Sequence, residues 1–240
     1  MKSWVICTGL RKTQAAQRNG ITFHITRFSR VPAVQHALSF FFDGPCLSSN
    51  RPSLNDTLLI GPTIKQDLYS IVLRFRIYQI AFTADITKMY RQVRIHQDDR
   101  RLQRILWRRS AEEPLRTYEL STVTYGTASA PYLVTRCLQQ LAEDESKDFS
   151  LAPEQLTNNF YVDDALCGAN TIENALRLQQ EFIALLGGGG FHLRKFCASH
   201  PITLETVPPD YREMEVPIEL DSNEGIKHWV CYGIHYEISS

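Results

Sequence analysis

Apolar residues recur three or four positions apart in three segments of the chain, residues 61–75, 129–141 and 170–186. This spacing puts them on one face of an α-helix, so each segment is predicted to form an amphipathic helix. The third helix is expected to start at Asn170, because a glutamate follows three positions later as in a capping box. Four consecutive glycines, residues 187–190, are expected to end it.

Other segments alternate between apolar and polar residues, as β-strands do. The clearest is residues 79–87, where Asp85 lies on the polar side of the alternation. Further strands are predicted at residues 103–108, 116–123 and 191–196, and the sequences FYV and ALC around residues 163 and 164 are predicted to form a tight hairpin. This order of elements predicts an α+β fold with helices packed on one face of an antiparallel sheet.

Composition and charge narrow the class of protein. The chain has 240 residues, of which 43% are hydrophobic, so it is long and apolar enough to bury a core. The net charge is zero, but ten basic and three acidic residues lie in 74–109, whereas seven acidic residues and one lysine lie in 143–164. This uneven distribution predicts a surface for a polyanion close to a site for cations.

The six cysteines are at least 30 positions apart and form no CxxC pair, which indicates reduced thiols. The apolar run at residues 4–10 is too short for a secretory signal peptide, and no segment approaches the roughly 20 apolar residues of a membrane span. We therefore expect a soluble cytoplasmic or nuclear protein that is not associated with a membrane.

Two adjacent carboxylates, Asp163 and Asp164, interrupt the apolar segment NNFYVDDAL at residues 158–166. Two such neighbours both stay ionised at low cost only if a cation lies between them, and Mg²⁺ is the usual one. A pair of Mg²⁺ ions bridged by carboxylates can activate an attacking oxygen and stabilise a leaving pyrophosphate. Asp85 is the best candidate for a third carboxylate. Adjacent aspartates are also common in ordinary turns, so a purely structural interpretation stays open.

Four segments, in this order along the chain, resemble the palm motifs of reverse transcriptases: TADITKMYRQV, TVTYGTASAPY, NNFYVDDAL and LLGGGGFHLRKF. They are most similar to the BEL/Pao group of long-terminal-repeat retrotransposons, and the resemblance runs from about Leu54 to Arg212. It implies an RNA-directed DNA polymerase, part of a retrotransposon Pol polyprotein. The implied fold is a palm-like antiparallel sheet backed by helices, with partial fingers and no complete thumb.

The resemblance also implies a catalytic site. Asp85, Asp163 and Asp164 match the three catalytic carboxylates, of which Asp85 and Asp163 would hold two Mg²⁺ ions, with Mn²⁺ as an alternative. Asp164 would assist, and the backbone carbonyl of Ile86 would complete the metal shell. Lys195 matches a basic residue near the pyrophosphate, a candidate proton donor. Strand alternation alone leaves open whether its neighbour Arg194 takes this place.

Substrate contacts follow from the same resemblance. Tyr90 matches the aromatic residue under the sugar of the incoming nucleotide, which would exclude a ribose 2′-OH and make the product DNA. Tyr125 and Gly126 match the segment that contacts the nucleotide and template. The basic stretch would then contact the RNA or DNA template–primer duplex, with Arg91, Arg94 and Arg104 as candidates. The alternatives are a core tyrosine, a turn glycine and solvated arginines.

The chain departs from the resemblance at both ends. In HALSFFFDG, residues 36–44, Ala37 and Ser39 stand where basic residues that clamp the triphosphate are expected. The tail does not match a primer grip and thumb, and no protease, RNase H or integrase segment is recognised. We therefore divide the chain into a poorly defined segment (1–45), a palm with partial fingers (46–212) and a divergent tail (213–240).

Two other functions remain open at this point. The chain could be an inactive remnant that keeps the palm fold and binds nucleic acid weakly. A metal-dependent nuclease would use the same carboxylates and would need a general base, for which His96 and His192 are the nearby candidates. Incorporation of nucleotides from deoxynucleoside triphosphates (dNTPs) would distinguish a polymerase from the inactive remnant and from the nuclease.

Overall fold

The computed structural model of the chain describes residues 43–47, 52–108 and 110–213, with the backbone of six short strands outside these ranges. The chain divides into two compact units. The first comprises residues 1–64 and 88–140, and the second comprises residues 65–87 and 141–240. The segments predicted as 1–45 and 213–240 lie almost wholly outside the described residues, so those boundaries stay predictions.

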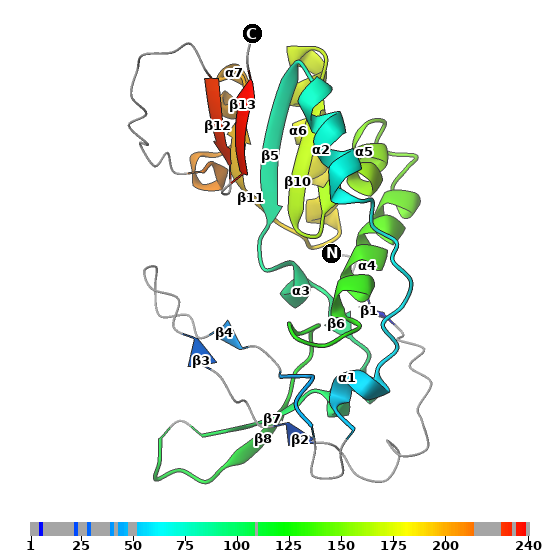
Figure 1. The fold of residues 1–240 in the computed structure, drawn as a ribbon, viewed down its shortest axis with the longest axis vertical. Coiled ribbons are helices and arrows are strands. Elements are labelled where there is room, and N and C mark those ends of the chain that lie inside the picture. The colour runs from blue at the N-terminus through cyan, green and yellow to red at the C-terminus, as the bar shows by residue number, and fades with distance from the viewer. Residues whose placement is uncertain are drawn as a thin grey trace. The chain divides into compact units, whose positions relative to one another are not determined.

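The second unit is built on a four-stranded antiparallel sheet in the order β11-β5-β10-β9 (Figure 1). Its strands are β5 (Ile80–Ile86), β9 (Phe160–Tyr161), β10 (Asp164–Ala169) and β11 (Leu193–Ala198). The predicted antiparallel α+β sheet is therefore confirmed, and β5 differs from its predicted range by one residue at each end. β11 lies two residues later than the strand predicted at residues 191–196.

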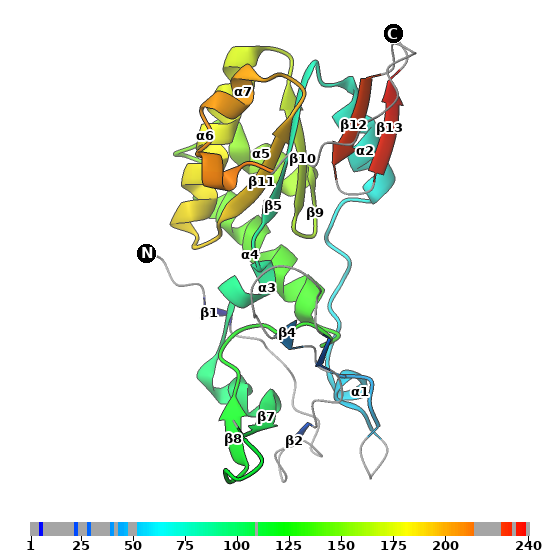
Figure 2. The same ribbon diagram turned by 90° about the vertical axis from the view of Figure 1, so that its left-hand side faces the viewer.

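Helices cover this sheet from two sides (Figure 2). They are α2 (Leu68–Ile77), α5 (Ala152–Asn158), α6 (Ile172–Gly188) and α7 (Ile202–Glu205), with a 3₁₀ turn η3 at Pro209–Tyr211. On one face, Phe182 of α6 packs edge-on against Phe82 of β5 and Phe160 of β9. On the other face, Tyr78 at the end of α2 packs against Gly168 of β10.

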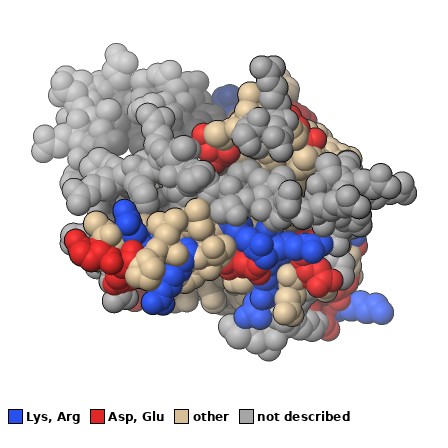
Figure 3. All heavy atoms as spheres, turned by 90° about the horizontal axis from the view of Figure 1, so that it is seen from below, with Lys and Arg blue, Asp and Glu red and all other residues tan. Residues whose placement is uncertain are grey.

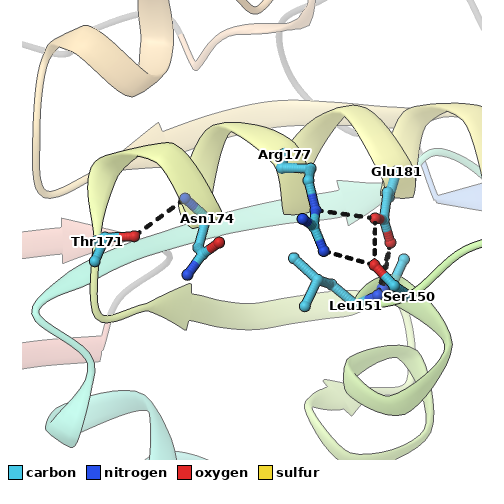
Figure 4. Close-up of polar contacts among 7 residues, drawn as sticks. Ser150, Leu151, Thr171, Asn174, Arg177 and Glu181 are labelled. Carbon is cyan, nitrogen blue, oxygen red and sulfur yellow. Dashed lines mark hydrogen bonds and ion pairs between the residues drawn. The ribbon is translucent and has the colours of Figure 1, made fainter.

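Two helices begin later than the sequence predicted. α2 starts at Leu68, seven positions after Gly61, because Gly61 has a left-handed φ of +82° and the Asp67 side chain caps the helix by accepting from Ser70 N. α6 is capped by Thr171 instead of Asn170, since the Thr171 hydroxyl accepts from Asn174 N (Figure 4). The glycine run is also partly helical: α6 continues to Gly188, and Gly190 takes the left-handed φ of +84°.

The start of α5 is held by a residue of α6 (Figure 4). Glu181 Oε2 accepts from the backbone N–H groups of Leu151 and Ala152 at 2.8 and 3.0 Å, and Arg177 pairs with the same carboxylate. Burial acts to raise the pKa of Glu181, but these hydrogen bonds and the Arg177 charge outweigh it and lower that pKa. Glu181 thus supplies the negative charge that the first turn of α5 favours.

The first unit carries shorter elements. They are α1 (Leu54–Thr57), α3 (Met89–Gln92), β6 (Arg94–Ile95), the 3₁₀ helix η2 (Gln97–Leu102), β7 (Arg104–Trp107), β8 (Arg116–Glu119) and α4 (Ala130–Asp144). β7 and β8 correspond to the strands predicted at residues 103–108 and 116–123 and pair in antiparallel fashion, although β8 ends four residues earlier than predicted. α4 begins in this unit, one residue after the predicted start, and its last residues belong to the second unit.

Several strands are described by their backbone alone. In the first unit, β1 (Val5–Ile6) and β2 (Thr22–Phe23) pair in parallel with β6 and β7, and β3 (Phe28–Ser29) pairs with β4 (Ser39–Phe40). In the second unit, β12 (Lys227–Cys231) and β13 (Ile234–Ile238) form an antiparallel pair. Among the described residues, no helix has the length and apolar character needed to cross a membrane.

Candidate active site

The β5–β10 register brings two of the predicted carboxylates together. Asp164 pairs directly with Asp85, 79 positions earlier in the chain. Directly opposed residues of an antiparallel pair point to the same face, with Cβ atoms typically about 5 Å apart. Asp163 lies in the adjoining turn, and its carbonyl oxygen accepts from Ile86 N at 2.8 Å, which fixes the turn to the end of β5. The second unit therefore gathers Asp85, Ile86, Asp163 and Asp164 at one end of its sheet.

The turn itself is strained. Tyr161 pairs with Asp164, which leaves Val162 and Asp163 as a two-residue hairpin loop. The predicted hairpin is present, but its loop lies one residue earlier than predicted, because Asp164 belongs to β10 and not to the loop. Val162 has a φ of +61°, a conformation in which a β-branched residue is unusual and costs of order 1–3 kcal/mol. Two-residue hairpin loops need a positive φ at their first position, where glycine or asparagine is usual. The strain therefore lies in the residue that precedes Asp163.

A β-bulge in β11 decides which basic residue faces Asp85. Arg194 pairs with Asp85 and Cys197 pairs with Thr83, so β11 has one extra residue, and Lys195 has a left-handed φ of +54°. Bulges of this kind re-aim side chains. Lys195 Nζ lies 4.0 Å from Asp85 Oδ2. Arg194 instead donates to the carbonyl of Asp210 at 2.8 Å and stacks on the Tyr211 ring.

Burial and neighbouring charges raise the pKa values of Asp85 and Asp164. Burial raises the pKa of Asp85, and the charge of Asp163 raises it further, whereas Lys195 lowers it. Burial also raises the pKa of Asp164 to about 6, with the charges of Asp163 and Asp85 adding to the effect and Lys195 opposing it. Full ionisation of this end of the sheet is therefore costly without an additional cation.

The donor set fits a hard divalent cation that arrives with its own ligands. Within the part of the chain that the structure describes, no three Asp, Glu, His or Cys side chains are grouped to enclose a metal ion. Mg²⁺ typically binds through one or two carboxylates and completes its shell with water and substrate phosphate oxygens. The oxygen atoms of Asp85, Asp163 and Asp164 would therefore leave part of the metal shell to water and phosphate.

The raised pKa of Asp164 leads to a prediction about stability. The carboxyl has an ordinary pKa of 3.8 and a folded pKa of about 6, so its ionisation disfavours the folded state as the pH rises through this window. In metal-free protein, Asp164→Asn is expected to raise the free energy of unfolding by about 1–2 kcal/mol at pH 7.5, after allowance for solvent screening.

Urea unfolding at a series of pH values measures this effect. The difference between Asp164→Asn and wild type should shrink below pH 6 and disappear below about pH 4, where both folded and unfolded carboxyls are protonated. Asp148→Asn, which changes an exposed aspartate of the same unit, should show no such trend. A difference that is constant with pH would contradict the prediction.

The predicted nucleotide contacts lie in the first unit. Tyr90 is 9% exposed, and its ring centroid lies 4.5 Å from that of Tyr125, tilted by 46°. The two rings support one another, which also agrees with the alternative that Tyr90 is a core aromatic. Gly126 has a φ of +93° and makes the turn before α4, a left-handed backbone conformation that favours glycine. Its contact with a nucleotide stays a prediction.

The predicted nucleic-acid contacts differ in their surroundings. Arg104 makes two hydrogen bonds to Glu119 Oε1, at 2.7 and 2.8 Å, and is thus partly neutralised. Arg91 is partly buried, and burial lowers its pKa, whereas Arg94 is exposed. Figure 3 shows basic and acidic residues interspersed on the face that it draws. The role of these arginines in binding nucleic acid therefore stays a prediction.

The two histidines considered for a nuclease have ordinary surroundings. His96 Nδ1 accepts from Asp98 N at the start of η2, in the first unit. His192 is exposed, and its carbonyl oxygen accepts from Thr87 N, next to the end of β5. The contact of His96 gives its side chain a structural role, and that of His192 involves the main chain alone, so neither contact adds support for the nuclease alternative.

Sequence reasoning missed the residue that anchors β9. Asn159 is 2% exposed, and its side chain accepts from Arg74 Nε at 2.9 Å and donates to Tyr78 Oη and Gln155 Oε1. Its carbonyl accepts from Leu166 N, which closes the hairpin of the two aspartates. The sequence shows only that an asparagine precedes FYVDD, and nothing in the periodicity marks it as buried.

Comparison with known families decides the relationship. The family described as "Reverse transcriptase (RNA-dependent DNA polymerase)" matches residues 49–195, more than half of the chain and a range that includes every predicted site residue. The chain belongs to the reverse transcriptase family. The family predicted from the sequence motifs is thereby confirmed for this reverse transcriptase domain.

Two solved structures are similar to this domain. The domain is similar to the crystal structure of the Prototype Foamy Virus protease–reverse transcriptase, with 16% identity and a TM-score of 0.50 over 68% of this chain and 19% of that chain. A foamy viral protease–reverse transcriptase in complex with double-stranded DNA has 17% identity and a TM-score of 0.48 over 68% of this chain and 25% of that chain. The first of these supports the palm-like fold. No curated protein matches the sequence.

Proposed function

We propose that this reverse transcriptase domain is the RNA-directed DNA polymerase of a BEL/Pao-type retrotransposon Pol polyprotein. In the proposed reaction it transfers a nucleotide from a dNTP to the 3′ end of a primer on an RNA or DNA template. The observation that carries the proposal is the pairing of Asp85 with Asp164 beside the turn that holds Asp163. These carboxylates come from separate strands, as a shared-cation site requires.

Each residue has a proposed role. Asp85, Asp163 and the carbonyl of Ile86 would hold two Mg²⁺ ions, or Mn²⁺ in their place, with Asp164 assisting. The ions would supply positive charge that neutralises the triphosphate and lowers the pKa of the attacking hydroxyl. Lys195 is the candidate for protonating the leaving pyrophosphate, which its position 4.0 Å from Asp85 supports.

Selection of the nucleotide would depend on the first unit. Tyr90, supported by the Tyr125 ring, would exclude a ribose 2′-OH, and Gly126 would let backbone approach the nucleotide closely. Arg91, Arg94 and Arg104 would contact phosphates of the template–primer duplex.

A second candidate function follows from Ala37 and Ser39, where the resemblance expects basic residues. Loss of a charged clamp on the triphosphate could reduce the rate by orders of magnitude. The domain would then be a remnant that binds nucleic acid without polymerising it.

Primer extension by the full chain separates the two candidates. A labelled DNA primer annealed to an RNA template, or to a DNA template of the same sequence, is incubated with dNTPs and Mg²⁺, Mn²⁺ or EDTA. The polymerase proposal expects extension on RNA with either cation and none with EDTA. Salt-sensitive binding of the duplex without extension in either cation would overturn it in favour of the remnant.

A further inference from the structure

Asn55 of α1 holds the main chain of a distant loop, residues 124–129, which contains Gly126. Its Oδ1 accepts from Ala128 N at 2.8 Å, and its Nδ2 donates to the carbonyl of Gly126 at 3.1 Å. We propose that Asn55 is a positioning residue that fixes this loop for binding of the incoming nucleotide. The inference rests on the proposed function, because it assumes that the loop contacts a nucleotide.

The position of Asn55 is itself well determined. α1 begins with a capping box between Ser53 and Asp56, and Leu54 beside Asn55 is 2% exposed in a cluster with Ile105. The backbone N–H of Asn55 donates to the carbonyl of Gly44 at 3.1 Å. The two hydrogen bonds from the Asn55 side chain to the loop, here called the Asn55 clamp, are therefore attached to a fixed element, as a positioning role requires.

Gly44 shows how closely these segments approach. A Cβ atom at this position would lie 2.5 Å from the Gly126 carbonyl oxygen and 2.6 Å from Asn55 Oδ1. Gly44 and Asn55 thus meet the distant Gly126, 71 positions after Asn55, with room for hydrogen atoms only. This close packing lets a short side chain reach two backbone groups of the loop at once.

Other contacts hold the loop at Thr124, Tyr125 and Thr127, so the bonds from Asn55 matter most at Gly126. Gly126 has a φ of +93°, and glycine gives the chain access to many other conformations. Behind the loop, Thr127 and Ser129 line a small cavity of about 30 Å³ together with Leu54 and Leu133, so packing alone leaves space for the loop to shift. The two hydrogen bonds from Asn55 oppose that shift.

The chemistry at position 55 requires a primary amide. One end of the side chain accepts from Ala128 N and the other donates to the Gly126 carbonyl. An aspartate could accept from Ala128 N, but its second oxygen would face the Gly126 carbonyl oxygen without a proton between them. Asn55→Asp is therefore expected to keep the shape of the clamp and lose half of its function, whereas Asn55→Ala removes both bonds.

Steady-state primer extension and amide hydrogen exchange of the full chain test the inference together. Asn55→Ala is expected to raise KM for dNTP by about 5- to 20-fold with kcat changed by less than about 3-fold, because the loss falls on nucleotide binding. Exchange at the Ala128 amide should become faster, and Asn55→Asp should give an intermediate KM with Ala128 still protected.

Gln139→Ala is the matched control. Gln139 Nε2 donates to the Ile64 carbonyl at 3.0 Å, which is also a bond from a side chain to a distant backbone group in the first unit. This variant is expected to lose some stability, through one hydrogen bond instead of two, with unchanged KM and Ala128 exchange. A KM for Asn55→Ala no higher than that of the control would overturn the proposal.

Failure of the proposed function has a different signature. Wild-type protein would then incorporate no nucleotide, and hydrogen exchange at the Ala128 amide alone would test whether Asn55 positions the loop. Faster exchange at Ala128 in Asn55→Ala, but not in Gln139→Ala, would support positioning of the loop. Unchanged exchange in Asn55→Ala would overturn the inference whatever the activity of wild type.

Discussion

Asp163→Asn is expected to reduce the rate of primer extension on the order of 10²–10³-fold or more, with the fold retained. The amide carries no charge and binds a hard cation weakly, so the site loses one of the carboxylates proposed to share the Mg²⁺ ions. Single-turnover extension on an RNA template measures the chemical step without interference from product release.

A second measurement on metal-free protein tests whether Asp163 acts on its neighbours. The charge of Asp163 raises the pKa values of Asp85 and Asp164, so both should fall in the variant when carboxyl groups are titrated by NMR. Asp148→Asn provides the control, because it removes the same charge from an exposed site in the same unit. Retention of wild-type extension by Asp163→Asn would reject the catalytic assignment.

Gly168→Ala is expected to lower the free energy of unfolding by about 2–3 kcal/mol. A Cβ atom at this position would lie 2.6 Å from the carbonyl oxygen of Ile80 and 2.7 Å from Tyr78 Cβ. Neither neighbour is the end of a flexible side chain, so relief requires β10 to move away from β5. Activity should fall as well, because the same strand pair holds Asp85 opposite Asp164.

Urea unfolding of Gly168→Ala, compared with wild type and with a second glycine-to-alanine variant, measures this change in the free energy of unfolding. Gly187→Ala is the control, since a Cβ there meets nothing within 4 Å and alanine favours the helix by up to about 1 kcal/mol. It should be neutral or stabilising. Equal midpoints for Gly168→Ala and wild type would show that the strand pair can accommodate the added methyl group.

The strongest local patterns predicted the elements that carry the site. Alternation over residues 79–87 predicted β5, because Phe82, Ala84 and Ile86 are buried on one side while Asp85 stays at the other. The hairpin around Asp163 was also predicted, although Val162 lacks the usual turn chemistry. Its strain is sustained by long-range bonds such as that from Ile86 N to Asp163 O, which no local pattern contains.

The missed features depend on partners far away in the chain. α5 was not predicted because its first turn is satisfied by Glu181, about 30 positions later. Likewise, the choice between Arg194 and Lys195 depended on a bulge, which exists only where β11 pairs with β5. Sequence alternation alone did not distinguish the two residues as the candidate for the basic position near the pyrophosphate.

The sequence by itself determined the family motifs, the buried strand and the adjacency of Asp163 and Asp164, because these depend on residues close together in the chain. Only the tertiary structure decided that Asp164 faces Asp85 and that Lys195 lies beside them. The physical reason is register: a slip of one residue turns every side chain to the other face, and the register is set by contacts across the whole sheet.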